Sequence, residues 1–190
     1  GLETAIADGR ITTGADLRSW LDGLLVAGSF RTDAILLAHA YRAADSAARL
    51  ADIAELGLAL TSSAERLQET TLSGEAFAIA ARAWPSDVFA RLPQPCPYPV
   101  VVGAVAAAHG IGLTDTLLAY LTAAIHTQIS VAVRLVPLGQ TAGLQVMAAL
   151  EPQVAHLAAI AADADLSDIG TTAYAADIAG RYFDLTLANG

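Results

Sequence analysis

The sequence predicts an all-α protein, a helical bundle of roughly eight to ten helices with a proline-rich central connector. Apolar residues recur at the i, i+3, i+4, i+7 spacing of amphipathic helices along most of the 190 residues, as in 17–25. No segment combines sustained apolar–polar alternation with hairpin turn signals, so strands are not expected. The length is typical of one domain, and we expect a single all-α domain over residues 1–190.

The first half of the chain predicts four helices, and three of them follow a Ser or Thr that can cap the free N–H groups of a first turn. Gly28 lies where the first helix would end, and Gly74 lies inside the fourth, where it weakens the helix. The first helix runs through 17–25 and is capped by Thr12 or Thr13, and the second runs through 35–41 and is capped by Thr32. The third covers 47–60, and the fourth covers 65–84 with its cap within 61–63.

Prolines separate the two halves, since Pro93, Pro95, Pro97 and Pro99 occupy every second position. Such a run cannot be helical, and 92–99 is therefore predicted to be an extended, stiff connector. Helices are expected again where the following apolar stretches are bounded by Gly, Pro or cap residues. They are 100–109, 117–136 with a cap at Thr114 or Asp115, 141–150, 152–162 with Pro152 at its start, and 173–183 after a loop at 163–170.

The composition indicates a surface that other proteins cover. Hydrophobic residues make up 55% of the chain and charged residues 15%, against about 45–50% and about 25% in typical soluble domains. Surplus apolar surface usually marks an interaction site, here for a partner or a second copy. The net charge of −9 disfavours nucleic acid and anionic membranes as partners, because both repel an acidic protein.

One segment, 117–136, is long enough to cross a membrane. It also carries His126, Gln128, Ser130 and Arg134, and such polar groups oppose insertion into lipid. We therefore expect a buried central helix and no membrane. Membrane association is kept as an alternative that a flotation assay would separate.

Several chemistries are excluded because all ten cations are arginine. A P-loop, a pyridoxal enzyme and a protein kinase each require a lysine. The four histidines never pair at i, i+3 or i+4, and the acidic loop at 163–168 lacks the Gly and Glu of an EF-hand. No nucleophile motif is found either. Carboxylates distant in sequence could still pair, but nothing in the residues argues for catalysis, and we expect no catalytic residue, no metal site and no cofactor.

Cys96 is the only cysteine, which excludes an intrachain disulfide and favours a reducing, cytoplasmic location. It lies between Pro95 and Pro97 without an adjacent base or cation. We therefore expect a packing role for this thiol and not a nucleophilic one.

The segment 134–140 is the most informative of the chain, because it closes a long apolar stretch with Arg134, Pro137 and Gly139 before Gln140. A proline ends or bends a helix, so we expect a defined joint between two helices here. Arg134 has two interpretations. It either satisfies carbonyl groups freed by Pro137 or pairs with an acid, or it faces a partner, since Arg is enriched at interface cores.

Several passages, taken in order, match one known pattern. They are GLE at 1–3 with DGR at 8–10, LRSWLDGLL at 17–25, DAILL at 33–37, PYPVVVG at 97–103 followed by Gly110 and Ile111, and SVAVRLVPLGQTAG at 130–143. On these passages the chain resembles the urease accessory protein UreF family. The last passage is the most specific, and the resemblance covers nearly all of the chain.

This resemblance implies an all-α, non-enzymatic protein that forms a homodimer. It implies binding to the accessory protein UreD (UreH in some bacteria), recruitment of the GTPase UreG and help in loading nickel into apo-urease. The family commonly ends in an Arg-His-Glu and Arg-Leu-Phe-Arg-Ser tail that docks partners, where this chain has Arg181 and Tyr182 without the His-Glu pair. The predicted partner-binding residues are Arg134, Pro137, Gly139, Gln140, Arg181 and Tyr182.

The alternative is an all-α enzyme or small-ligand-binding protein with a pocket between helices. Arg134 facing a cavity that also holds a histidine and an acid would favour this alternative. Arg134 bonded to the backbone or to an acid beneath a flat surface would favour a scaffold.

Overall fold

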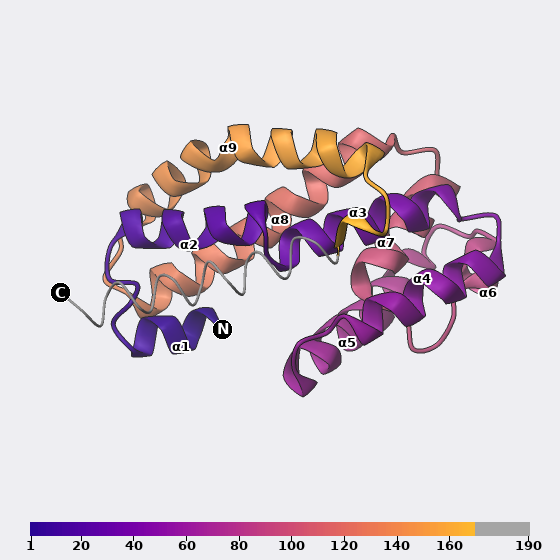
Figure 1. Cartoon of the computed structure of the whole chain (residues 1–190), viewed down its shortest axis with the longest axis horizontal. Coiled ribbons are helices and arrows are strands. Elements are labelled where there is room, and N and C mark those ends of the chain that lie inside the picture. Colours follow the sequence, from indigo (N-terminus) through magenta and orange to yellow (C-terminus); the bar gives the residue numbers. More distant parts are fainter. Residues whose placement is uncertain (170–190) are drawn as a thin grey trace. The chain divides into compact units, whose positions relative to one another are not determined.

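The structure, a computed structural model, describes residues 1–169 as helices joined by turns, with no strand among them (Figure 1). This confirms the predicted all-α fold. The predicted helix at 173–183 lies outside the described residues. In chain order the helices are α1 (Leu2–Ala7), α2 (Gly14–Val26), α3 (Ser29–Arg42), α4 (Ala47–Ala59), α5 (Ala64–Ala81), α6 (Val88–Arg91), α7 (Tyr98–Ala108), α8 (Leu113–Leu135) and α9 (Gln140–Asp163).

Contacts within the chain define two compact units, each assembled from segments that are distant in sequence. Among the described residues, the first contains Gly1–Thr32, Leu118–Ile160 and 167–169. The second contains Asp33–Leu117 and Ala161–Leu166. The single domain expected over residues 1–190 stays a prediction, and the two units are described separately below.

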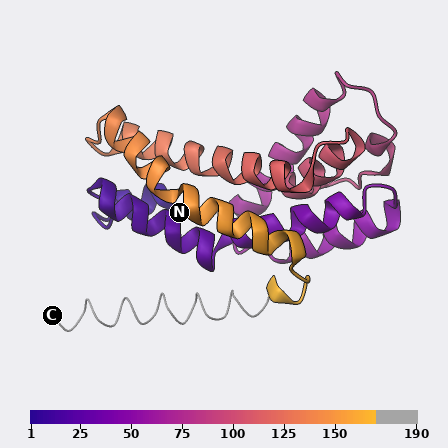
Figure 2. The ribbon, with the colours of Figure 1, turned by 90° about the horizontal axis from the view of Figure 1, so that it is seen from above.

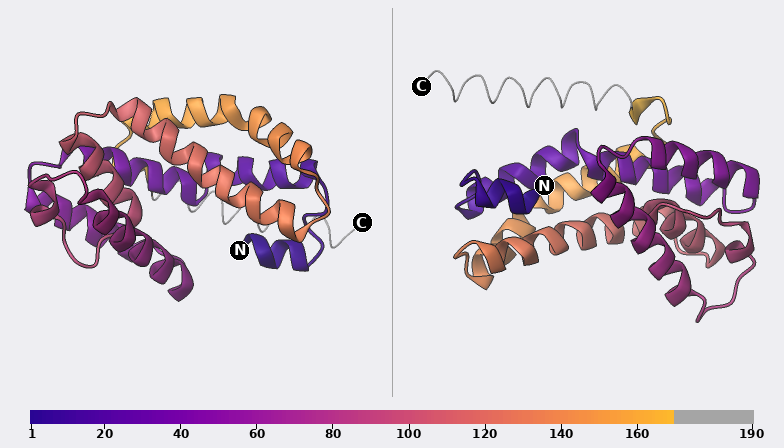
Figure 3. Two further views of the ribbon diagram at one scale, coloured as in Figure 1. Left: turned by 180° about the vertical axis from the view of Figure 1, so that it is seen from behind. Right: turned by 90° about the horizontal axis from the view of Figure 1, so that it is seen from below.

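Small residues let the helices of the first unit pack closely. A Cβ added at Gly143 on α9 would lie 3.0 Å from the Cγ2 atoms of Ile129 and Val133 on α8. One added at Gly14 on α2 would lie 3.6 Å from Val146 on α9. Figures 2 and 3 show α8 turning back at its C-terminal end into α9. The buried apolar side chains of this unit include Leu17, Leu21 and Leu25 of α2 and Leu121, Ile125 and Ile129 of α8.

Thr13 caps α2, as the sequence predicts. Its hydroxyl accepts a hydrogen bond from the Asp16 N–H at 3.2 Å. The Asp16 carboxylate in turn accepts from the N–H groups of Thr12 and Thr13, at 3.0 and 2.9 Å. This reciprocal capping box satisfies donors that the helix itself leaves free. The hydroxyls of Ser46 and Ser63 accept equivalent bonds at the starts of α4 and α5.

The second unit is built around α7, which packs against α4, α5 and α6. Most of α7 is buried, including Val100, Val101 and Val105. A Cβ added at Gly103 would collide with the carbonyl group of Leu37 on α3, so the glycine allows α7 to lie against the backbone of α3. Figures 2 and 3 show α5 at the edge of this unit.

Two predicted helix starts are wrong by a few residues. α3 begins at Ser29 and not after Thr32, because its first turn follows directly on Gly28, whose carbonyl accepts from the Thr32 N–H at 3.4 Å. α8 begins at Leu113, so the predicted caps lie within its first turn. In both places the helix starts immediately after a glycine, a few residues before or within one residue of the predicted cap.

The predicted connector at 92–99 is also too long. α7 starts at Tyr98, so Pro99 lies in its first turn, where a missing N–H costs no hydrogen bond. The connector is therefore 92–97, and it contains a cis peptide bond between Gln94 and Pro95.

The two helices predicted at 141–150 and 152–162 are one continuous helix, α9, with Pro152 in its interior. An interior proline costs about 3 kcal/mol, because it removes one hydrogen bond and crowds the preceding turn. Leu150, Val154 and Leu157 are buried on either side of it, and burying such side chains contributes about 1.5–3 kcal/mol each. Burial therefore outweighs the local cost, and Figure 1 shows α9 as a single curved ribbon.

Two of the described helices, α8 and α9, are long and apolar enough to cross a membrane. Core helices of soluble proteins meet the same criteria of length and composition. In α8 the side chains of Leu121, Ile125 and Ile129 recur every four residues and are buried, which is the pattern of an amphipathic helix that packs on one face.

Candidate functional site

The joint between α8 and α9 is a tight turn that presents most of its residues to solvent. α8 ends at Leu135, and the Leu138 N–H donates to the Val136 carbonyl at 2.6 Å. α9 then starts at Gln140, with the Gly139 carbonyl accepting from Gly143. The predicted joint is therefore confirmed as a structural feature. Its exposed residues, which form the joint surface, are Arg134, Leu135, Pro137, Gly139, Gln140, Thr141 and Leu144.

Arg134 lies on the exposed side of the last turn of α8. Its Nε donates to the Ser130 carbonyl, one turn earlier in the same helix, at 3.3 Å. A cation in the last turn of a helix is favoured by the helix dipole. Bonded to backbone and exposed, Arg134 matches the arrangement that favours a scaffold over a pocket-based function.

The joint surface includes two exposed leucines. Leu144 is 69% exposed and Leu135 52% exposed. Leu135 follows Arg134 in the last turn of α8, and Leu144 lies in the first turns of α9. Arginine and apolar residues together are typical of interface cores. Two of the six residues predicted to bind partners, Arg181 and Tyr182, lie outside the described residues. The other four all lie at this joint.

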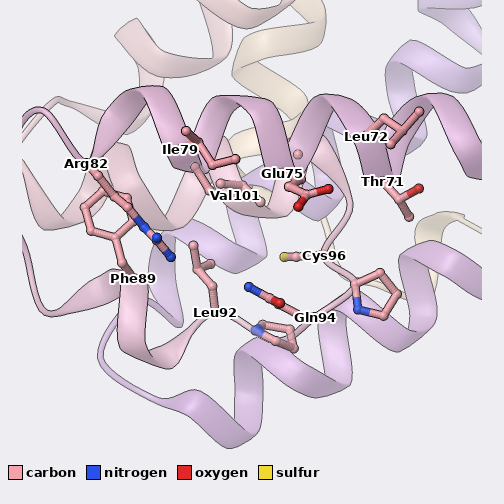
Figure 4. Close-up of a pocket in the computed structure, with 14 residues that line it drawn as sticks. Thr71, Leu72, Glu75, Ile79, Arg82, Phe89, Leu92, Gln94, Cys96 and Val101 are labelled. Carbon is pink, nitrogen blue, oxygen red and sulfur yellow. The ribbon is translucent and has the colours of Figure 1, made fainter.

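A second feature is a cleft of about 450 Å³ in the second unit, between α5 and the segment that runs from α6 to α7 (Figure 4). Its lining is mixed: Ile79, Phe89 and Leu92 are apolar, whereas Glu75 and Arg82 are charged. Both charged residues extend from α5 toward the cleft in Figure 4. The full lining is Thr71, Leu72, Gly74, Glu75, Ala78, Ile79, Arg82, Phe89, Leu92, Pro93, Gln94, Pro95, Cys96 and Val101.

The cleft exists because α5 holds the connector at two points. A Cβ on Gly74 would collide with the Cys96 carbonyl, so only glycine allows this approach of the backbones. The Thr70 hydroxyl accepts a hydrogen bond from the Tyr98 N–H at 3.2 Å. It thereby caps α7, because Pro97, the residue before this helix, makes no side-chain cap bond. Phe77 packs edge-on against Tyr98, with ring centroids 5.7 Å apart. Gly74, which weakens the helix locally, is thus required by packing.

Cys96 is buried at the end of the connector. Burial raises the pKa of its thiol to about 12, because a thiolate is poorly solvated there. The cleft lining contains no histidine that could act as a base. The expected packing role of Cys96 agrees with this environment, since an activated cysteine needs a lowered pKa.

An exposed side of α5 that borders the cleft carries an apolar stripe. Leu72 and Ile79 are 55% and 60% exposed, and Ala76 and Ala83 are exposed beside them. These four residues form the α5 stripe. Sequence reasoning missed both the stripe and the cleft, although Leu72, Ala76, Ile79 and Ala83 follow the four-and-three spacing of a coiled-coil seam.

The four histidines differ in their surroundings within the described structure. His39 shares a hydrogen bond of 2.9 Å with the Ala164 carbonyl, whereas His109, His126 and His156 are exposed. Within residues 1–169, no three His, Cys, Asp or Glu side chains are grouped so that they could hold a metal ion.

Comparison with known proteins places these features in a family. The family model described as UreF matches residues 11–151, which include the joint, the cleft and the α5 stripe. The chain belongs to the UreF family. The relatives that it matches are named urease accessory proteins.

Individual relatives agree over most of their length. The urease accessory protein UreF of Agrobacterium fabrum is 45% identical over 179 residues, which cover 94% of this chain and 80% of that protein. That of Rhizobium etli is 48% identical over the same shares of both chains. That of Brucella ovis is 44% identical over 178 residues, or 94% of this chain and 78% of the relative.

Proposed function

We propose that this chain is a scaffold for urease maturation. It binds UreD (UreH), recruits the GTPase UreG and, as a homodimer, helps to load nickel into apo-urease in the cytoplasm. Membership in the UreF family supports the accessory role. The partners and the nickel step are inferred from the resemblance of the sequence to that family.

The joint surface is the observation that carries the proposal within this molecule. It combines an exposed arginine with Leu135 and Leu144, both more than half exposed, on a turn fixed by Pro137. A rigid turn loses little conformational entropy on binding, which favours affinity. Arginine beside apolar side chains is a frequent composition of binding hot spots.

A pull-down with purified UreD and UreG tests the proposal. We expect the wild-type chain to co-elute with UreD, and with UreG when UreD is present. The double variant Arg134→Ala/Gln140→Ala should weaken capture by about tenfold or more, as for a hot-spot residue. Arg18→Ala is the matched control, because Arg18 is also an exposed helical arginine but lies on α2. A chain that stays monomeric and never co-elutes with UreD or UreG would disprove the proposal.

The alternative of a small-ligand site between helices finds less support. It requires Arg134 in a cavity with a histidine and an acid, whereas Arg134 is exposed and bonded to its own helix. The cleft beside α5 contains one acid, Glu75, and one base, Arg82, but its lining has no histidine. A ligand-binding function would instead have to use this cleft.

A further inference from the structure

The cleft beside α5 has two charged side chains on its rim that lack partners. Glu75 and Arg82 are exposed on α5 and extend toward the cleft in Figure 4. Neither side chain forms a hydrogen bond or an ion pair within residues 1–169. Residues seven positions apart lie about 10.5 Å apart along a helix, whereas helical ion pairs join residues three or four apart. The cleft therefore offers one negative and one positive charge, on one wall, to a bound molecule.

The rest of the cleft is largely apolar. Of its lining residues, Cys96 and Val101 are buried, and Phe89 and Leu92 are half-buried. Phe89 and Leu92 lie across the cleft from α5 in Figure 4. A volume of about 450 Å³ lies in the range of ligand sites, which combine apolar walls with a few polar groups that orient the ligand.

The connector supplies backbone groups on the wall opposite α5. Within the described part of the chain, no hydrogen bond involves the N–H of Gln94 or the carbonyl groups of Pro93, Gln94 and Pro95. Gln94 and Pro95 are also exposed. A helix has already paired its own backbone groups and cannot bond to these. An extended segment keeps its N–H and C=O groups available, so the connector favours an extended peptide as the occupant.

The spacing of the two charges selects among extended conformations. A polyproline-II segment has three residues per turn and rises about 3.1 Å per residue, so side chains three positions apart lie on the same edge, about 9.3 Å apart. This is close to the separation of about 10.5 Å between Glu75 and Arg82 along α5. A β-strand places side chains of one face about 6.7 or 13.4 Å apart and fits less well.

We propose that the cleft binds a polyproline-II segment of another protein. In this segment a basic side chain meets Glu75, an acidic side chain three positions away meets Arg82, and an apolar side chain between them packs toward Phe89. Grooves with aromatic and apolar walls bind such segments, because their preformed conformation loses little entropy on binding. This inference goes beyond the proposed function, which uses the joint surface and not the cleft.

The first test varies the spacing of the charges in a synthetic peptide. The probe is the capped peptide Pro-Arg-Leu-Pro-Glu-Pro with a neutral fluorescent label, and its base and acid are three positions apart. The isomer Pro-Arg-Pro-Glu-Leu-Pro has the same composition with the charges two positions apart. Fluorescence anisotropy with the full chain in its native oligomeric state should show saturable binding of the probe. The isomer should bind at least about fivefold more weakly, because one of its charges turns away from the rim.

The second test reverses one charge of the chain at a time. Arg82→Glu leaves two acids on the rim, and the preference should shift by about fivefold toward a peptide with two arginines at the same spacing. Glu75→Arg leaves two cations and should shift the preference by a similar factor toward two glutamates. Arg18→Glu on α2 and Glu55→Arg on α4 are the matched controls, since both residues are exposed helical residues outside the cleft lining. Circular dichroism verifies that each variant is folded.

Several results would overturn the inference. They are no saturable binding of the probe, equal affinity for the two isomers, or an unchanged charge preference in both rim variants. Equal binding of a helical peptide whose charges lie seven positions apart would also overturn it, as would equal displacement by free arginine and glutamate. A helix or a small charged molecule would then be the occupant.

The capture of UreD and UreG is measured separately from peptide binding. A chain that captures both proteins and leaves the probe unbound overturns this inference alone. A chain that binds the probe with the expected preferences supports the inference even if UreD and UreG are never captured, and that failure counts against the proposed function alone.

Discussion

The carboxylate of Asp33 on α3 lies 2.7 Å from the guanidinium of Arg66 on α5. The Asp33 side chain is only 13% exposed, and that of Arg66 is 32% exposed. Arg66 also binds Glu69 one turn further along α5, at 3.1 Å. This pair joins two helices of the second unit and orients the start of α5, the helix that carries the stripe and one wall of the cleft.

Asp33→Ala should lower the free energy of unfolding by about 1–3 kcal/mol, because it leaves a partly buried guanidinium without its main partner. Urea denaturation measures the loss. Asp8→Ala is the control: the Asp8–Arg10 pair is 3.5 Å long with both side chains more than half exposed, so its loss should cost less than about 1 kcal/mol. Equal losses in the two variants would contradict the bridging role of Asp33.

Gly103→Ala should destabilise the second unit by about 1–3 kcal/mol, the usual effect of overpacking. The added Cβ would meet the carbonyl group of Leu37, a backbone atom that cannot move aside as a side chain can. Gly23→Ala serves as the comparison, because no atom lies within 4 Å of a Cβ at this position in α2. There we expect a gain of about 0.5–1 kcal/mol from the better helix propensity of alanine. Thermal unfolding of both variants shows whether the signs differ.

The capping box of α2 makes part of the stability depend on pH. Hydrogen bonds hold the pKa of Asp16 below its ordinary value of 3.8. The bond from the N–H of Thr12 has the largest effect, and the bonds with the hydroxyl and the N–H of Thr13 come next. A lowered pKa in the folded state stabilises the protein above the unfolded value, and this contribution disappears as the pH falls through the folded pKa. Asp16→Asn should therefore lose less stability than the wild type between neutral pH and pH values below 3.8. Parallel denaturation curves across that range would argue against the effect.

Cys96 should resist thiol reagents in the folded protein. Its pKa of about 12 leaves very little thiolate at pH 8, and the side chain is buried. With Ellman's reagent we expect almost no reaction in buffer and one full equivalent after unfolding in urea. Rapid reaction of the native chain would mean that the connector opens readily.

The chain should remain in the dense fractions of a flotation assay with anionic vesicles. Its net charge of −9 is repelled by such a surface, and α8 buries one apolar face within the protein. Flotation with vesicles at physiological salt would instead support the membrane alternative raised by the length of α8 and α9.

Local sequence signals were sufficient where the decisive interactions span a few residues. The helices around Leu17 and Leu50, the caps at Thr13 and Ser63 and the joint at Pro137 follow from spacing and capping within one or two turns. The same signals failed at two places. At Thr32 the helix had already begun directly after Gly28, and at Pro152 burial on both sides of the proline overrides the local preference.

By itself, the sequence determined the helical class, the joint before α9 and, through its specific passages, the family, because each depends on neighbouring residues or on a matched pattern. Tertiary structure alone decided which face of α5 is covered. That helix has small or apolar residues on both sides, Thr70 and Gly74 on one and Leu72 and Ile79 on the other. The choice between them depends on the connector and α7, which are brought to α5 by folding, and a packed face needs a distant partner that no local pattern specifies.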